Sequence, residues 1–242
     1  VETRLSWRDY LGTVKVRLGI GRNRYRVAPG LYKVGDPDQS SSVFVSANYK
    51  MSFDHLRKGL SGIDAWILVL NTRGVNVWCA AGKGTFSTGE VIRMVQKSGL
   101  AKFVSHRELI LPQLSAPGVA AHEVLKTTGF KVRFGPVRTK DIKHFMENGK
   151  RANDAMRMVT FSLWERFILT PLELTSRIAV SFYIIAAIFV VSGLPSGFSS
   201  FQETLSRGSF GAAAYIIGLF AGAVVTPLIL PWLPGRSFAL KG

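Results

Sequence analysis

Hydrophobic and polar positions alternate in a way that predicts an α/β domain over residues 1–160. Residues 65–70 form a continuous apolar run, typical of a central parallel strand covered on both faces. Strand patterns recur at residues 43–46, 75–78, 102–105 and 131–134, and helical patterns at 51–59, 119–128 and 140–148. A further helix is predicted to follow a cap at Thr85 or Ser87, to run through Ser98 and to end at Gly99. This order of strands and helices favours a Rossmann-like, mostly parallel sheet covered by helices.

The N-terminal pattern is shorter. Residues 13–18 alternate polar and apolar side chains, which predicts a strand. We expect this strand to pair with residues 25–27 across the glycine-containing turn at 19–21.

Two long uncharged stretches follow the α/β region. Residues 178–202 and 208–235 carry no charged side chain, and each exceeds the roughly 18–20 apolar residues that cross a bilayer. The alternative is a pair of buried core helices. We predict a membrane region at 161–242 with transmembrane helices at about 174–194 and 209–233. Because two helices alone would make an unusually small membrane domain, we expect that this chain is truncated and that further helices follow.

Basic residues flank both uncharged stretches, up to Arg177 on one side and at Arg236 and Lys241 on the other. The tendency of basic loops to stay inside predicts a multi-pass protein of the cytoplasmic (inner) membrane whose α/β domain faces the cytoplasm. Residues 195–207 would then form a short outer hairpin. The charged N-terminal residues do not resemble a cleavable signal peptide.

The excess of basic residues narrows the classes of possible partner. The net charge is +16, and residues 1–160 hold 26 of the 31 basic and 12 of the 15 acidic residues. Such an excess suits nucleic acid, anionic lipid or a phosphate-bearing cofactor. No basic motif interleaved with aromatic residues is evident, so we predict no nucleic-acid partner.

The single cysteine, Cys79, excludes an intramolecular disulfide and a multi-cysteine metal cluster within this sequence. It is expected just after a strand and just before a helix, where the helix N-terminus and Lys83 both favour a thiolate. A thiolate there is a nucleophile, a redox sensor or a ligand of a soft metal, and the alternative is a buried structural cysteine. The small residues Ala80, Ala81, Gly82 and Gly84 leave the backbone bare enough for a large flat ligand.

Two further loops are of the same kind. Residues 113–121 are small and precede a predicted helix, and residues 135–138 follow a predicted strand, with Arg138 available for a carboxamide or phosphate. Because loops after parallel strands meet at one edge of the sheet, these segments predict a single broad ligand surface. The segment 82–85 lacks the preceding glycine of a phosphate-binding P-loop, which speaks against a nucleotide triphosphatase.

The sequence Asn-Val-Trp-Cys-Ala-Ala-Gly-Lys at residues 76–83 resembles the signature of the membrane-bound corrinoid protein family of microbial mercury methylation. Residues 113–123 and 135–138 resemble segments shared with the corrinoid iron–sulfur protein of the acetyl-CoA pathway. The similarity extends over most of residues 10–242, including 169–174 and 230–236. The cysteine motif separates the two families, since the acetyl-CoA pathway protein has no cysteine ligand there.

The resemblance implies a corrinoid-dependent methyltransferase. It implies a cobalamin-type corrinoid over the loop edge of the sheet, with the Cys79 thiolate as lower axial ligand of cobalt, and inorganic Hg(II) as the methyl acceptor. It also implies a methyl-folate-linked donor and a ferredoxin-like iron–sulfur protein as reductant. The loops and the resemblance together indicate these cofactor-contacting residues: Asn76, Val77, Trp78, Ala80, Ala81, Gly82, Lys83, Gly84, Thr85, Ser105, His106, Gln113, Leu114, Ala116, Pro117, Gly118, Val119, Gly135, Pro136, Val137 and Arg138.

Two other hypotheses remain open at this point. A corrinoid methyl carrier of one-carbon metabolism would bind the cofactor without needing Cys79. A basic, membrane-tethered binding module would bind no cofactor and would have a salt-sensitive affinity for its ligand.

Overall fold

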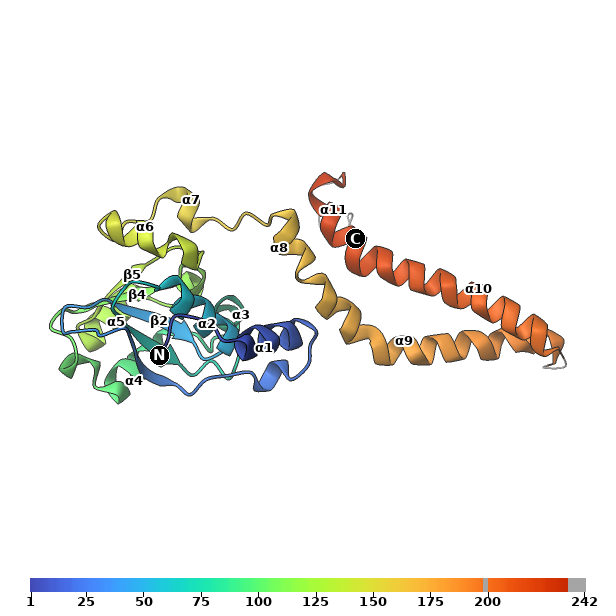
Figure 1. Ribbon diagram of the computed structural model, residues 1–242, viewed down its shortest axis with the longest axis horizontal. Helices are drawn as coiled ribbons and strands as arrows, with labels where there is room; N and C mark the ends of the chain where they lie inside the picture. The colour runs from blue at the N-terminus through green and yellow to red at the C-terminus, as the bar shows by residue number, and fades with distance from the viewer. Residues whose placement is uncertain (198–199, 235–242) are drawn as a thin grey trace. The chain divides into compact units, whose positions relative to one another are not determined.

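A computed structural model describes residues 1–197 and 200–234 of the chain (Figure 1). The chain divides into two compact units. The first comprises residues 1–16 and 21–159, and the second comprises residues 17–20 together with the chain from Thr160 onwards.

The first unit is built on a five-stranded sheet, which confirms the predicted mostly parallel α/β fold. The strands lie in the order β1 (Gly30–Val34), β3 (Ala65–Leu70), β2 (Val43–Ala47), β4 (Glu108–Leu111) and β5 (Lys131–Phe134). Neighbouring strands are parallel except β1, which runs antiparallel to β3 at one edge. The sequence pattern did not predict β1, because a partly exposed edge strand lacks a clear apolar run.

Helices occupy most connections of this unit. They are α1 (Trp7–Arg17), η1 (Arg22–Arg24), α2 (Lys50–Gly59), α3 (Val77–Gly82), α4 (Thr88–Ser98), η2 (Leu100–Lys102), η3 (Gln113–Gly118), α5 (Ala121–Thr128), η4 (Thr139–Asp141), α6 (Ile142–Glu147) and α7 (Asp154–Arg157). The predicted end of α4 at Gly99, which has φ 61°, is confirmed. Of the two predicted caps, Ser87 is the one used, because its hydroxyl accepts a hydrogen bond from the Glu90 amide at 3.3 Å.

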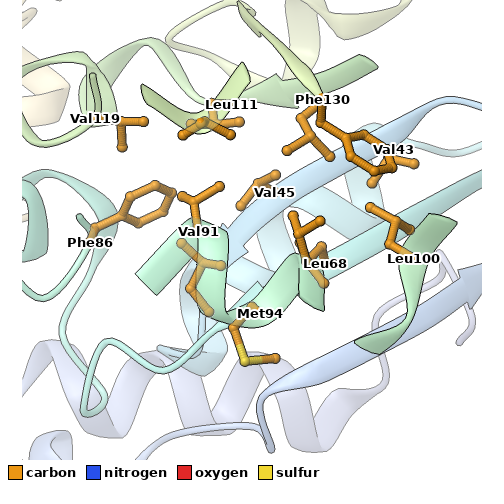
Figure 2. Packing of buried hydrophobic residues seen from close by; sticks show 14 of the residues in the cluster. Val43, Val45, Leu68, Phe86, Val91, Met94, Leu100, Leu111, Val119 and Phe130 are labelled. Carbon is orange, nitrogen blue, oxygen red and sulfur yellow. The ribbon is translucent and has the colours of Figure 1, made fainter. Parts of the chain in front are cut away.

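Successive residues of the buried strands face opposite sides of the sheet and form two separate cores. Leu68 of β3 packs with Val91 of α4 on one side, as Figure 2 shows, whereas Ile67 packs with Phe53 of α2 on the other. Each buried side chain of this size stabilises the fold by about 1.5–3 kcal/mol. The sheet is therefore covered on both faces, and its strand ends are the part left open to ligands.

The prediction of a strand at residues 13–18 that pairs with 25–27 is wrong, because residues 13–17 belong to α1 and Arg26 instead forms an isolated bridge with Tyr49. The alternation of Val14 and Val16 also fits a helix, in which Val14 shares a face with Leu11. Only Val16 of α1 is buried. The pattern over six residues was too short to separate the two periods.

The prediction of a strand at residues 75–78 is also wrong. Helix α3 starts at Val77, and Asn76 is its N-cap residue, because the Asn76 side chain accepts a hydrogen bond from the Cys79 amide. Cys79 therefore lies in the first turn of a helix and not in a loop between a strand and a helix.

The strand predicted at 102–105 lies six residues further on, as β4. The chain leaves α4 through η2 and a turn, in which the Ser105 amide donates to the Gln39 carbonyl at 2.8 Å. This turn carries the chain to the start of β4, where Glu108 pairs with Lys131 of β5.

The second unit contains two long apolar helices. Helix α9 (Thr170–Gly193) follows α8 (Leu163–Phe167), and η5 (Leu194–Ser196) follows α9. Helix α10 (Phe201–Phe220) continues through a π-helical segment (Ala221–Val225), α11 (Thr226–Ile229) and η7 (Leu230–Trp232). By length and composition alone, the stretches Leu163–Gly193 and Phe201–Ile229 are long and apolar enough to cross a membrane.

Helices α9 and α10 pack closely against each other. The hydroxyl groups of Ser181 and Tyr215 are hydrogen-bonded at 2.8 Å. A Cβ at Gly211 would lie 2.7 Å from Ile188, so a glycine allows this close approach. The hairpin predicted at 195–207 is shorter than expected, since α10 already begins at Phe201. Residues 236 and 241, on which the predicted orientation partly rests, lie outside the described residues.

Candidate functional site

A cavity of about 300 Å³ opens at the carboxyl edge of the sheet. It lies where β2, β4 and β5 end and where α3 begins, which is the position at which parallel sheets usually bind ligands. Its walls are mostly apolar. The lining residues are Phe44, Val45, Ser46, Ser52, His55, Leu56, Asn76, Val77, Trp78, Ile110, Leu111, Pro112, Leu114, Gly135, Pro136, Val137, Thr139 and Ile142.

Seven of the predicted cofactor-contacting residues line this cavity. They come from three separate parts of the sequence: Asn76, Val77, Trp78, Leu114, Gly135, Pro136 and Val137. The structure thus brings the three predicted loops to one place. The contribution of α2, through Ser52, His55 and Leu56, was missed because an amphipathic helix beside a strand carries no sequence signal for a site.

Cys79 is exposed and directly follows Trp78, which lines the cavity, but Cys79 is not itself a lining residue. Its amide donates to the side-chain oxygen of Asn76 at 2.9 Å, which secures the first turn of α3. The neighbouring Trp78 lines the cavity and is still 60% exposed, so the indole has one free face. An exposed thiol and a flat apolar surface are therefore adjacent, and the alternative of a buried structural cysteine is wrong.

The backbone after Cys79 is bare on its outer side. A Cβ added at Gly82 or Gly84 would meet no atom within 4 Å, and Gly84 has φ +72°. Lys83, between them, is exposed. This surface leaves room for a large ligand to approach the main chain next to the thiol.

Helix α3 packs against η3. Gly118 of η3 packs so tightly that an added Cβ would overlap the carbonyl oxygen of Phe86 and lie 3.1 Å from Cα of Ala81. Ala80, Ala81 and Val119 are buried in the core, where they support the site without facing it. The Thr85 hydroxyl donates to the Ala80 carbonyl at 3.4 Å.

Gln113, the first residue of η3, carries an unusual polar group. Its side-chain oxygen Oε1 is buried, and no hydrogen-bond donor reaches it among the described residues. A buried acceptor without a donor costs free energy, so such a group is a candidate for contact with a ligand or ordered water. The other residues of η3 that we predicted, Ala116 and Pro117, follow Leu114 along the same short helix.

Asn48, which the sequence analysis missed, fixes the path of the chain into α3. Its buried side-chain oxygen accepts hydrogen bonds from the Thr72 amide, the Thr72 hydroxyl and the Gly74 amide at 3.1, 2.9 and 2.9 Å. The Thr72 hydroxyl also lies 2.7 Å from the Val75 carbonyl, so its single hydrogen is shared between these two acceptors. An asparagine directly after a buried strand is the only signal that would have indicated it.

The loop after β5 is anchored on both sides. The Gly135 amide donates to the Leu111 carbonyl at 2.8 Å, and the Val137 amide donates to the Met156 carbonyl at 2.8 Å. A Cβ at Gly135 would lie 3.0 Å from Ile110, so this glycine permits close packing at the cavity wall. Arg138 follows at the start of η4 and is partly exposed.

Two predicted residues are not brought to the site. Ser105 and His106 precede β4, at the end of that strand opposite to Pro112. The Ser105 hydroxyl donates to Gln39 at 3.1 Å, and Nε2 of His106 is hydrogen-bonded to the Ser41 carbonyl at 3.0 Å. Both side chains stabilise a turn at the far edge of the sheet, so we leave them out of the candidate site.

Comparison with known proteins places this fold in a recognisable group. The family model described as CO dehydrogenase/acetyl-CoA synthase delta subunit matches residues 14–146. The acetyl-CoA decarbonylase/synthase complex subunit gamma of Archaeoglobus fulgidus is 32% identical over 140 residues, which are 56% of this chain and 29% of the relative. The subunit of the same name from Methanopyrus kandleri is 32% identical over 129 residues, 52% of this chain and 27% of the relative.

A third relative matches a shorter stretch. Subunit gamma 2 of the complex from Methanosarcina thermophila is 37% identical over 90 residues, 36% of this chain and 19% of the relative. In all three cases the matched segment spans less than a third of the relative's length.

Proposed function

Because the chain belongs to the CO dehydrogenase/acetyl-CoA synthase delta subunit family, we propose that its α/β unit binds a corrinoid at the carboxyl edge of the sheet. We propose further that the chain is a corrinoid-dependent methyltransferase that converts inorganic Hg(II) to methylmercury. The observation that carries this proposal is the exposed thiol of Cys79 beside an apolar cavity.

The residues at this edge fit such a cofactor. The cavity is open and mostly apolar, so an apolar part of such a cofactor can occupy it. The rest of the cofactor would lie over the bare backbone at Gly82 and Gly84.

When bound, a corrinoid supplies a cobalt centre that takes a methyl group from a donor and passes it to an acceptor. In this proposal Cys79 would hold the cofactor through a thiolate ligand to cobalt. Thiolate is a soft and strongly electron-donating ligand, which would favour transfer of a methyl group to a soft electrophile. Hg(II), delivered as a thiolate complex, is an acceptor of that kind.

Asn76 and Trp78 have supporting roles. By capping α3, Asn76 holds the Cys79 backbone in one orientation, which a metal ligand needs. Trp78 offers an apolar surface one residue away from the thiol.

The proposed reaction needs two protein partners. A methyl-folate-linked protein would supply the methyl group, and a ferredoxin-like iron–sulfur protein would supply electrons to return the cofactor to its reactive state. The net charge of +14 over residues 1–160 suits an acidic electron-transfer partner.

We also propose that the second unit is a membrane region of the cytoplasmic membrane, with the α/β unit on the cytoplasmic side. In the stretch Leu163–Gly193, none of the most apolar 18-residue window is buried by protein. In the stretch Phe201–Ile229, 11% of the corresponding window is buried. Apolar helices that are not covered by protein are stable in lipid and costly in water. The basic character of residues 1–160 agrees with the preference of basic segments for the cytoplasmic side.

A second candidate function is a methyl carrier of one-carbon metabolism. The names of the relatives favour it, since they are subunits of acetyl-CoA decarbonylase/synthase complexes. Such a carrier would bind the same cofactor, but its methyl group would pass to a protein-bound carbon centre and Cys79 would not be needed.

The experiment compares the full chain with Cys79→Ala and Cys79→Ser after anaerobic loading with cobalamin. We expect all three to bind cobalamin, and the visible absorption spectrum of the unchanged chain alone to show a thiolate-dependent shift. Methylated samples are then given Hg(II) with excess thiol, and methylmercury is measured by mass spectrometry. We expect its formation to fall at least about 100-fold in both variants, because even residues that only orient a metal ligand contribute about 10–100-fold.

The outcomes separate the two functions. Identical spectra and equal methylmercury formation in all three proteins would favour the methyl carrier. A folded chain that binds no cobalamin would exclude both functions. Far-ultraviolet circular dichroism checks that the variants are folded.

A further inference from the structure

The outer face of α1 is a stripe of exposed apolar side chains. Trp7, Tyr10, Leu11 and Val14 are 69, 52, 43 and 52% exposed. They follow the spacing i, i+3, i+4 and i+7, so they lie on one side of the helix. In an ordinary amphipathic helix such a stripe faces the core. We call these four residues the α1 apolar face.

The opposite side of α1 is the one fixed to the protein. Val16 is buried, and the Asp9 carboxylate accepts hydrogen bonds from Lys50 at 2.5 Å and from Arg57 at 2.9 Å. These ion pairs anchor the helix to α2. The helix therefore cannot turn its apolar face inward without breaking charged contacts that are largely shielded from water.

Positive charge surrounds the α1 apolar face. Arg8 and Lys15 stand on the same flank of the helix and are exposed, at about 100° and 80° from Trp7 in a helix of 100° per residue. Residues 3–35 contain eight Lys or Arg residues and a single acid, Asp9, whose carboxylate is already paired. The surface around this helix is therefore cationic as well as apolar.

We propose that α1 docks on an anionic membrane surface, with its axis in the plane of the bilayer and the α1 apolar face in the headgroup region. A helix with Trp and other apolar residues on one side and Lys or Arg beside them has the composition of interfacial helices. Trp and Tyr favour the boundary between headgroups and acyl chains. The basic residues add attraction to anionic lipids, which reaches only about a Debye length from the surface.

This inference is independent of the corrinoid chemistry. It rests on the proposed membrane region, which brings the α/β unit to a bilayer and raises the local concentration of lipid at α1. Docking would limit the rotation of the α/β unit and give the carboxyl edge of the sheet a defined orientation to the membrane.

The test uses the full chain with Cys79→Ser, so that one new cysteine can carry a fluorescent label. Leu11→Cys reports on α1. Leu125→Cys is the matched control, because Leu125 of α5 is an exposed leucine of almost the same exposure, 46%. Val190→Cys in α9 reports on the membrane region separately. The proteins are reconstituted in lipid nanodiscs of phosphatidylcholine, with or without one third phosphatidylglycerol, that contain a spin-labelled lipid as quencher.

We expect quenching of the Leu11 label in anionic discs to exceed that of the Leu125 label at least about twofold. It should weaken in neutral discs and in about 1 M salt, where charge attraction is screened within about 3 Å. Combined Arg8→Glu and Lys15→Glu should reduce it to the level of Leu125. The Val190 label should be quenched in both lipids, so failure of the membrane region and failure of docking are distinguishable.

Three results would overturn the proposal. A Leu11 label that is no more quenched than the Leu125 label shows that α1 is away from the bilayer. A Leu11 label shielded from both the lipid quencher and aqueous iodide shows that protein covers this face. Equal quenching in neutral and anionic discs shows that the basic residues do not recognise anionic lipid.

Discussion

The side-chain oxygen of Asn48 accepts a hydrogen bond from the Thr72 hydroxyl at 2.9 Å, which joins the loop after β2 to the loop after β3. The same oxygen also accepts the amides of Thr72 and Gly74. Both residues are buried. Asn48 does not line the cavity, but its hydrogen bonds fix the loop that leads into α3, the helix that carries Cys79.

Replacing Asn48 by leucine should therefore affect both stability and the site. The Gly74 amide would lose its acceptor, whereas the Thr72 amide and hydroxyl would keep the carbonyls of Leu70 and Val75. A buried unsatisfied group costs about 1–3 kcal/mol. We expect the free energy of unfolding of the α/β unit to fall by about 2 kcal/mol and cobalamin to bind more weakly. Hydrogen exchange of the amides in residues 70–80 of the full chain measures the first effect.

Asn71→Ala is the control for this prediction. Asn71 is exposed, and its side chain accepts only the Arg73 amide, at 3.2 Å. We expect a change below about 0.5 kcal/mol, as for most surface positions. Equal exchange rates in the two variants would show that the Asn48 hydrogen bonds do not fix this loop.

Two glycines near Cys79 should respond in opposite ways to alanine. At Gly118 an added Cβ would overlap Phe86 and crowd Ala81, so Gly118→Ala should destabilise the α/β unit by about 1–3 kcal/mol. At Gly82 the space is open, and alanine suits a helix better than glycine.

Gly82→Ala should therefore keep or slightly raise stability and still weaken cobalamin binding, because the new methyl group occupies the proposed approach to the backbone. Thermal unfolding and a cobalamin titration of both variants separate packing from binding. Unchanged cobalamin affinity in Gly82→Ala would exclude this backbone from the cofactor site.

The parts of the fold that follow from long or capped patterns were predictable from sequence. The strand β3 was predicted from its continuous apolar run, and the helix α4 was predicted from its cap residue, its apolar periodicity and the glycine at its end. The strand predictions at residues 13–18 and 75–78 were wrong because a short alternation fits either period. The burial of Val16 and the local N-cap made by Asn76 fixed the helical conformation.

The candidate site divides in the same way. Bare, glycine-containing loops after strands indicated Asn76, Leu114 and Gly135, since the topology of a parallel sheet brings such loops together. Asn48 and His55 were not predictable, because their role depends on contacts between elements far apart in sequence. Ser105 was predicted to end a strand at residues 102–105 and so to lie at the carboxyl edge of the sheet. It instead precedes β4 and lies at the opposite edge.

Acid should weaken the attachment of α1. Burial by itself would raise the pKa of Asp9, but hydrogen bonds from Lys50, Ser6 and Arg57 outweigh it, so the pKa lies well below the ordinary value of 3.8. A carboxyl group whose pKa is lower in the folded state than in the unfolded state stabilises the fold at pH values above its unfolded-state pKa. This stabilisation is lost as the pH falls through the folded-state pKa. The same holds for Glu108, whose pKa is lowered by Lys150 and Arg133 against the effect of burial.

We expect the advantage of the unchanged chain over Asp9→Asn to be full above about pH 5 and to shrink steadily towards about pH 2. At pH 7 it should be about 1.5–3 kcal/mol, as for hydrogen bonds to charged groups. Denaturant unfolding at several pH values measures it. A difference that does not change with pH would show that the ionised carboxylate of Asp9 contributes nothing to the attachment.

The cap of α3 provides a test of how finely Cys79 must be positioned. Asn76→Ala removes the acceptor of the Cys79 amide and should cost about 1 kcal/mol of stability, whereas Asn76→Asp keeps an acceptor and should cost much less. If Cys79 is the cobalt ligand, fraying of this six-residue helix should weaken the thiolate-dependent shift in the cobalamin spectrum. We expect the shift to be reduced in Asn76→Ala and restored in Asn76→Asp. A full shift in both variants would show that the thiol reaches the cofactor without the cap, and loss in both would show that the Asn76 amide itself contacts the ligand.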